Sequence, residues 1–274
     1  MINPFSNIFL LTLSLLPFAA CNRGSDRKVD ISTIVNNDSI PASIKQLVRS
    51  VADNDSVQFA KLVSYPLSRP YPLHDLNTPE DLKCYYSTLV DDSLKSVIIN
   101  STAANWEEYG WRGWSLDRGE YLWIDDNVYD IPYISQTERN MLDSLRNAEI
   151  MSLHESLRKG WQPVSTLIAD DKSGIYRIDS TKTKDNHLVY RLCGFESGTD
   201  LNGKPTSVFT GYKETEGTAS TEVYHFSDSK GNEVIYEPYV PDGSKPQLEF
   251  IKQDSSSVSI PVHNGYWLDL RQKI

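Results

Sequence analysis

Cysteine is scarce in this sequence, and neither glycine nor proline is enriched. There are 3 cysteines, 14 glycines and 14 prolines among 274 residues. These counts exclude a disulfide-rich scaffold, a collagen-like chain and a low-complexity chain. Hydrophobic residues make up 39% of the sequence. A chain of this length and composition can therefore bury a core without covalent cross-links.

Positive charge is in deficit, and the common catalytic motifs are missing. The sequence has 27 Lys and Arg residues against 37 Asp and Glu residues, a formal net charge of −10. A general nucleic-acid binder needs a basic face, so nucleic acid is not expected as a partner. The P-loop, GxSxG and HExxH motifs do not occur. No cofactor or metal is predicted, and a non-catalytic role is favoured over an enzymatic one.

The longest apolar run, residues 8–20 (IFLLTLSLLPFAA), has the length of a signal-peptide core. It is too short to span a bilayer, which takes about 20 apolar residues. The small residues Ala19 and Ala20 lead into Cys21, an ending that resembles the lipobox of bacterial lipoproteins. The resemblance implies that residues 1–20 are removed and that the Cys21 thiol is acylated. An ordinary secretory signal followed by a coincidental cysteine is the alternative.

The segment after the cysteine is polar and aperiodic, which is typical of a tether. Residues 21–38 would comprise the lipidated Cys21 and this tether (NRGSDRKVDISTIVNND). Several acyl chains on one cysteine suffice for stable membrane anchoring. The chain also resembles the uncharacterised two-domain lipoproteins of Gram-negative bacteria. Asn22, and not an Asp, follows the cysteine, which for a lipoprotein favours the outer membrane. We therefore expect a lipid-anchored protein of the Gram-negative cell envelope, on its periplasmic or surface face.

Residues 39–160 show helical patterns that enclose a short run of strand-like sequence. Asp55, Thr78 and Ser135 have the chemistry of helix N-caps, and Ser135 is followed by Glu138 as in a capping box. Strands are predicted within residues 109–134, with a hairpin about the turn 117–119. A helix is then predicted from residue 138 to about 159. The expected unit is an α+β domain, with helices packed on a bent antiparallel sheet.

Residues 161–274 carry nine short runs rich in β-branched and aromatic residues, separated by polar turns. Their spacing of about 10–12 residues is typical of an all-β sandwich or barrel. No helix is predicted in this part. The last of the nine runs is YWLDL, residues 266–270. The two expected domains meet near Gly160.

The order of elements in the first half, with the motif YGWRGWSL…GEYLWID, resembles the nuclear-transport-factor-like fold, also called cystatin-like. That resemblance covers about residues 39–135. It implies a cone-shaped unit in which the concave face of the sheet lines a pocket.

The densest aromatic cluster lies within this motif and is the candidate ligand site. An aromatic platform with a basic anchor suits a sugar ring or a peptide. On a regular strand Trp111 and Trp114 would point to opposite faces, unless Gly110 and Gly113 introduce a bulge. The alternative is that the aromatic side chains pack against one another in the core. The candidate ligand-binding residues are Trp111, Arg112, Trp114, Tyr121 and Trp123.

Two cysteines remain beyond the lipobox. Cys84 lies in a predicted helix and Cys193 in a predicted strand, each flanked by apolar residues. We expect two separate buried thiols, with a disulfide as the alternative in an oxidising envelope.

Three functions stay open at this point. The favoured one is a non-catalytic binding role in the envelope, with a glycan, a peptide or an envelope protein as ligand. The second is an inhibitor or immunity-type protein that acts through residues 161–274, for example through the polar loop at 196–203. The third is a cone-fold hydrolase or isomerase, which requires an acid/base pair in a concave pocket.

Overall fold

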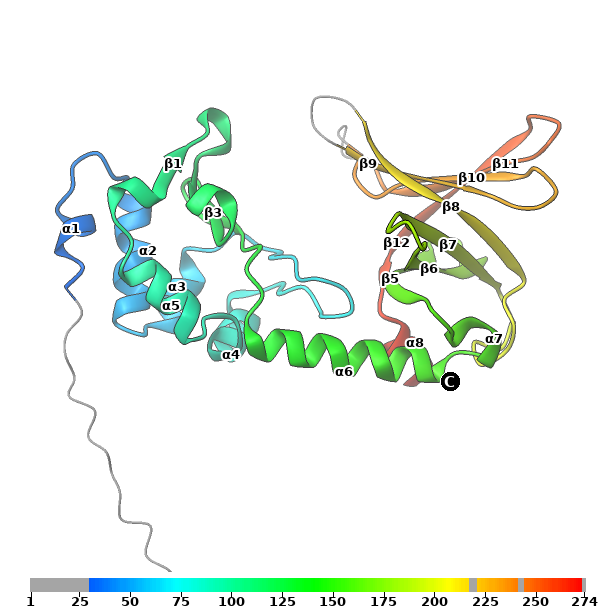
Figure 1. The fold of residues 1–274 in the computed structure, drawn as a ribbon, viewed down its shortest axis with the longest axis horizontal. Helices are drawn as coiled ribbons and strands as arrows, with labels where there is room; N and C mark the ends of the chain where they lie inside the picture. The colour runs from blue at the N-terminus through cyan, green and yellow to red at the C-terminus, as the bar shows by residue number, and fades with distance from the viewer. Residues whose placement is uncertain (1–29, 217–220, 241–243, 273–274) are drawn as a thin grey trace, which may run out of the picture. The chain divides into compact units, whose positions relative to one another are not determined.

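Five short helices begin the part of the chain that the structure describes. The computed structural model describes residues 30–216, 221–240 and 244–272, so the predicted signal segment, Cys21 and most of the predicted tether lie outside it. Helix α2 contacts both α3 and α5 (Figure 1). Their apolar faces contribute most of one hydrophobic core. The helices are α1 (Ser32–Val35), α2 (Ala42–Ala52), α3 (Ser56–Lys61), α4 (Pro79–Leu89) and α5 (Asp92–Ile99).

The predicted helix starts are confirmed by their caps. Asp55 accepts hydrogen bonds from the backbone N–H groups of Val57 and Gln58 at the start of α3. Thr78 caps α4, and Ser135 forms a capping box with Glu138 at the start of α6 (Gln136–Ser152). A side-chain acceptor at this position satisfies backbone donors that the helix itself leaves unpaired.

A small antiparallel sheet completes the first core. Its strands are β1 (Trp106–Glu108), β2 (Trp114–Leu116), β3 (Leu122–Ile124) and β4 (Val128–Asp130), paired in that order. Leu116, Leu122, Ile124 and Val128 are fully buried in the same core as the helices. Helices packed on an antiparallel sheet are thus confirmed in this half. The closer resemblance to a cone fold stays a prediction.

Two details of the first half differ from the prediction. Residues 109–113 are not strand, because Gly110 and Gly113 adopt positive φ angles of 58° and 71° around the 3-10 turn η2 (Gly110–Arg112). The helix expected to reach residue 159 ends at Ser152. A separate turn of helix, α7 (Glu155–Arg158), follows and is capped by His154.

A closed antiparallel barrel of eight strands follows, in the order β10-β11-β12-β5-β6-β7-β8-β9 (Figure 1). Its interior is filled by large side chains, among them Tyr176, Tyr190, Tyr224 and Phe226. The barrel prediction is confirmed over the sandwich. The strands are β5 (Gln162–Ala169), β6 (Gly174–Lys182), β7 (Leu188–Glu196), β8 (Ser207–Glu216), β9 (Thr221–Ser227), β10 (Glu233–Glu237), β11 (Gln247–Ile251) and β12 (Ser257–Gly265).

The ninth predicted strand is wrong, because its residues form α8 (Trp267–Gln272). Trp267 is fully buried there against Phe195, with ring centroids 5.2 Å apart. The loop at 196–203 folds onto this same cluster through the buried side chain of Leu201. The expected domain boundary near Gly160 stays a prediction.

Buried charges link α6 to the barrel. The Arg177 guanidinium contacts the Glu149 carboxylate, and its Nε lies 2.7 Å from Asp179 Oδ1. Arg191 Nη2 lies 2.6 Å from the other Asp179 oxygen. The Tyr71 hydroxyl donates to Glu149 Oε1 at 2.8 Å. Two guanidinium groups and two carboxylates are thus buried in contact with one another, as buried charges in proteins generally are.

Cys84 and Cys193 are both free thiols, as expected. Cys193 is buried on β7, and burial raises the pKa of its thiol to about 12. Cys84 is exposed on α4, so the prediction that it is buried is wrong. Its flanking residues Leu82 and Tyr86 take the core-facing positions of that helix instead.

Candidate functional site

The turn between β1 and β2 carries the most exposed tryptophan of the described residues. Trp111 is 88% exposed, at the tip of η2. The positive φ angles of Gly110 and Gly113 turn the backbone sharply here, which a residue with a side chain rarely does. A Cβ on Gly113 would lie 2.5 Å from the carbonyl oxygen of Ile124, so the turn packs directly on the end of β3.

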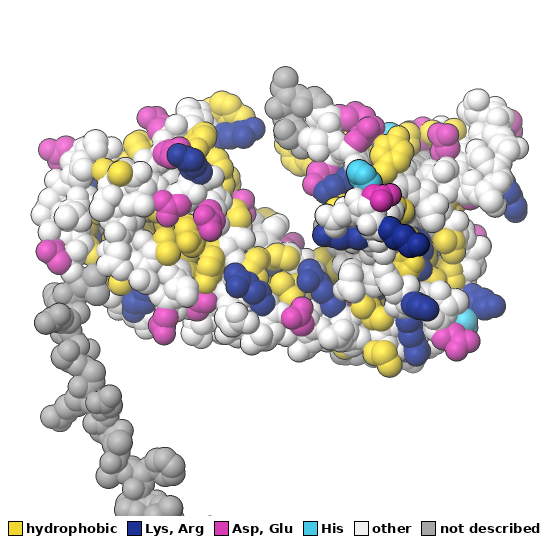
Figure 2. Space-filling view, viewed as in Figure 1, with side chains coloured by type: hydrophobic (Ala, Val, Ile, Leu, Met, Phe, Trp, Pro, Cys, Tyr) yellow, Lys and Arg dark blue, Asp and Glu magenta, His cyan; other side chains and the backbone are white. Residues whose placement is uncertain are grey.

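Beside this turn lies an open cavity of about 430 Å³. Hydrophobic, basic and acidic side chains lie next to one another on the surface over β1 and β3 (Figure 2). The η2 turn, β3, β4 and the turn between the last two supply the walls. The cavity is lined by Trp111, Arg112, Trp123, Asp125, Tyr129 and Asp130.

The aromatic walls are held in place from behind. The Trp123 ring packs on Tyr109, with ring centroids 5.1 Å apart. A Cβ on Gly119 would lie 2.5 Å from the Trp123 indole, so the ring sits directly against the backbone of the 117–119 turn. The Tyr129 hydroxyl donates to the carbonyl oxygen of Arg112 at 2.9 Å, which ties β4 to η2. The walls are thus formed before any ligand arrives.

Charges of both signs face the same cavity. The Arg112 guanidinium carbon lies 5.1 Å from the centre of the Trp111 ring, within the range of a cation–π contact. Asp125 and Asp130 provide two carboxyl groups. Partial burial raises the pKa of Asp130. Burial and, after it, the negative charge of Asp130 also raise the pKa of Tyr129.

The structure brings three of the five predicted site residues to the cavity. Trp111, Arg112 and Trp123 line it. Trp114 and Tyr121 pack instead against the hydrophobic core, each partly buried. The core alternative therefore holds for Trp114 and Tyr121. Ligand binding by the three residues that line the cavity stays a prediction.

Sequence reasoning missed half of the cavity lining. Asp125, Tyr129 and Asp130 lie in the segment 109–134, where strands but no site role are predicted for them. They reach the cavity because β4 pairs with β3 across the register shift at Trp123 and Ile124. The one available signal was the sequence DDNVYD (residues 125–130), which places acids and an aromatic next to the tryptophan cluster.

Comparison with known proteins does not extend this description. No protein-family model, no curated protein and no solved structure matches the chain. Among the described residues, no helix has the length and hydrophobicity needed to cross a membrane.

Proposed function

We propose that this protein is a lipid-anchored binding protein of the cell envelope, and that the cavity beside Trp111 binds a glycan. The observation that supports this most directly is the pairing of an exposed tryptophan with polar groups around one open cavity. Trp111 does not stand alone, because Trp123 and Tyr129 line the same cavity. A contiguous apolar patch rimmed by polar groups is typical of an interaction site. Binding sites for small ligands typically combine such apolar walls with a few oriented polar groups.

The chemistry of the lining suits a sugar ring. The C–H face of a pyranose is apolar and stacks on an indole, while its hydroxyls both donate and accept hydrogen bonds. Trp111, Trp123 and Tyr129 offer ring faces or edges. Carboxylates such as Asp125 accept from hydroxyls, and the Arg112 guanidinium donates to them. The aromatic side chains therefore match the apolar face of a sugar ring, and the charged side chains match its hydroxyl groups.

A peptide that adds a strand to the small sheet is less well supported. Strand addition needs free backbone groups along an edge strand. On β4, the N–H of Val128 donates to Leu62 and the carbonyl of Val128 accepts from Ser64. The centre of that edge is thus already paired with the segment after α3.

The anchor rests on Cys21, which lies outside the described residues. Its test is metabolic labelling with a palmitate analogue in cells that express the full chain. The wild type should carry the label, and Cys21→Ser should not. Label that persists in Cys21→Ser would contradict lipidation at this residue.

The test of the glycan site is a glycan microarray probed with the mature chain. Trp111→Ala should lose the glycans that the wild type retains. Tyr239→Ala is the matched control. Tyr239 is an aromatic residue just after β10 of the barrel, and it is 61% exposed. Failure of the wild type to retain any glycan, or equal binding by Trp111→Ala, would contradict the proposal.

A hydrolase of the cone-fold type is the second candidate, favoured by one observation. Asp125 and Asp130 line the same cavity, and burial raises the pKa of Asp130. A carboxyl group with a raised pKa beside a second carboxyl group is a common arrangement in general acid catalysis. A glycan identified on the array should then be cleaved by the wild type and not by Asp130→Asn. Binding without cleavage by the wild type would exclude this second candidate.

A further inference from the structure

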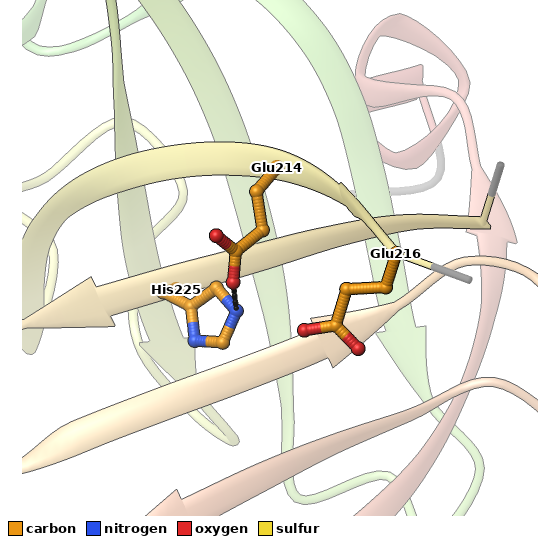
Figure 3. A group of neighbouring side chains, drawn as sticks. All are labelled: Glu214, Glu216 and His225. Atoms are coloured by element: carbon orange, nitrogen blue, oxygen red, sulfur yellow. Dashed lines mark ion pairs between the residues drawn. The ribbon is translucent and has the colours of Figure 1, made fainter.

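A second group of side chains, on the barrel and away from the cavity, has the composition of a metal site. We propose that Glu214, Glu216 and His225 bind a divalent transition-metal ion, with Zn²⁺ as the representative ion. One ligand atom from each residue lies within 4.8 Å of the other two. Figure 3 shows the two carboxylates and the imidazole facing one another from neighbouring strands.

The strand pattern places these three residues together. Glu214 and Glu216 are two positions apart on β8, so both point to the same face of the strand. His225 lies on β9, opposite Tyr212 in the antiparallel register. Gly211 allows the two strands to approach closely, because a Cβ there would overlap the carbonyl group of His225. The group is therefore fixed by strand pairing and not by a flexible loop.

The imidazole is held with one nitrogen toward the acids. Its ring stacks on Tyr212, with centroids 5.2 Å apart and planes 18° apart. Nε2 lies 2.9 Å from Glu214 Oε1. That nitrogen is buried, and its contact with Glu214 lacks the geometry of a hydrogen bond. A metal ion between the nitrogen and the carboxylates would bind all three side chains.

The two glutamates of this group also carry negative charge that no lysine or arginine of the described residues offsets. The nearest lysine on these strands, Lys213, pairs with Glu222. Glu216 forms no ion pair within the described parts of the chain, and Glu214 pairs only with the imidazole there. Two carboxylates side by side repel each other. A divalent ion would offset both charges.

The donor set selects the kind of ion. Ca²⁺ and Mg²⁺ take oxygen ligands almost exclusively. One imidazole nitrogen with two carboxylates suits Zn²⁺ and its neighbours in the first transition row. Zinc ligands lie about 2.0–2.2 Å from the ion, so the exposed glutamates must close slightly around it. Three protein ligands would leave a fourth position for water.

The experiment is equilibrium dialysis of the mature chain, first stripped with EDTA, against ZnCl₂. The wild type should bind one Zn²⁺ more than His225→Ala does. Glu216→Gln should weaken that site at least tenfold. CaCl₂ at the same concentration should not compete. Thermal unfolding gives a second readout, since a bound ion raises the midpoint of the wild type and not that of His225→Ala.

Two control variants separate this site from other metal-binding side chains. Glu222→Gln removes a carboxylate from the same pair of strands, and His263→Ala removes a histidine paired with Asp170 elsewhere on the barrel. Both should keep the wild-type stoichiometry. Equal zinc binding by the wild type and His225→Ala would overturn the proposal, as would loss of the ion in Glu222→Gln.

Discussion

The Tyr129 hydroxyl lies 2.9 Å from the backbone carbonyl oxygen of Arg112 and donates a hydrogen bond to it. This bond joins the outer strand of the small sheet to the turn that presents Trp111. Hydrogen bonds within the turn, from the Arg112 N–H to the Tyr109 carbonyl and from the Gly113 N–H to the Gly110 carbonyl, fix its shape but not its place against β4. The position of the exposed indole therefore depends on a residue 17 positions away in the sequence.

We expect Tyr129→Phe to weaken glycan binding several-fold while costing only about 0.5–1.5 kcal/mol of stability, the usual net contribution of one hydrogen bond. The ring that lines the cavity is kept, and only the bond to the η2 turn is lost. Affinity would be measured by titration with a glycan from the array. Tyr109→Phe is the control, because it removes a hydroxyl bonded to Glu107 outside the cavity lining. Unchanged affinity in Tyr129→Phe would show that the turn is held by other contacts.

Gly119 supports the Trp123 wall, and Gly119→Ala should destabilise the fold more than Gly160→Ala. Both glycines have positive φ angles, 82° and 79°. Alanine in that region costs about 1–2 kcal/mol at either position. A Cβ at Gly160 meets no atom within 4 Å, whereas one at Gly119 meets the Trp123 indole. Overpacking should add about 1–3 kcal/mol at Gly119 alone. Chemical denaturation measures the free energy of unfolding of both variants. Equal losses in Gly119→Ala and Gly160→Ala would show that Trp123 does not pack tightly on Gly119.

A buried ion pair fixes the chain just after β4. Arg69 donates from Nε and Nη2 to the two oxygens of Glu138, at 2.8 Å each, and from Nη1 to the carbonyl of Ile131. Both side chains are 1% exposed or less. Glu138→Gln leaves a buried guanidinium without its counter-charge, so we expect a loss of about 3–5 kcal/mol. Glu80→Gln, which breaks an exposed pair with Lys83, should leave the unfolding free energy unchanged. Similar losses in the two variants would refute a special role for the buried pair.

Asp130 should make stability depend on pH. Burial raises its pKa in the folded protein above the value of about 3.9 in the unfolded chain. Between these two values the folded state binds more protons, so the free energy of unfolding falls as pH rises through that range. Asp130→Asn removes this pH dependence. At pH values above that range, its free energy of unfolding should exceed that of the wild type. Asp125→Asn, an exposed acid of the same cavity, is the control. Parallel pH profiles for the wild type and Asp130→Asn would contradict a raised pKa.

Local patterns in the sequence predicted most elements of the fold. The first eight of the nine expected strands of the barrel are present, because alternating β-branched and aromatic residues bounded by turns indicate strands strongly. The caps at Asp55, Thr78 and Ser135 were equally readable. YWLDL failed because five residues are too few to separate strand from helix periodicity. The last segment instead forms α8, in which Trp267 packs against Phe195 on the barrel.

The site was harder to predict than the fold. Trp111 and Trp123 were found because the tryptophans are concentrated in one segment. Their separation from Trp114 depends on the φ angles of Gly110 and Gly113, which no periodicity reports. The metal-ligating group depends on which residues of β8 and β9 lie near one another, a matter of register and twist. Which residues of two strands lie side by side can be read only from the folded structure.

The most direct test of the central claim is an NMR titration of the indole N–H groups of the six tryptophans with a glycan retained on the array. We expect the signals of Trp111 and Trp123 to shift, and those of Trp161 and Trp267 to stay in place. Unchanged Trp111 and Trp123 signals at saturation, or shifts confined to Trp161 and Trp267, would contradict a glycan site in this cavity.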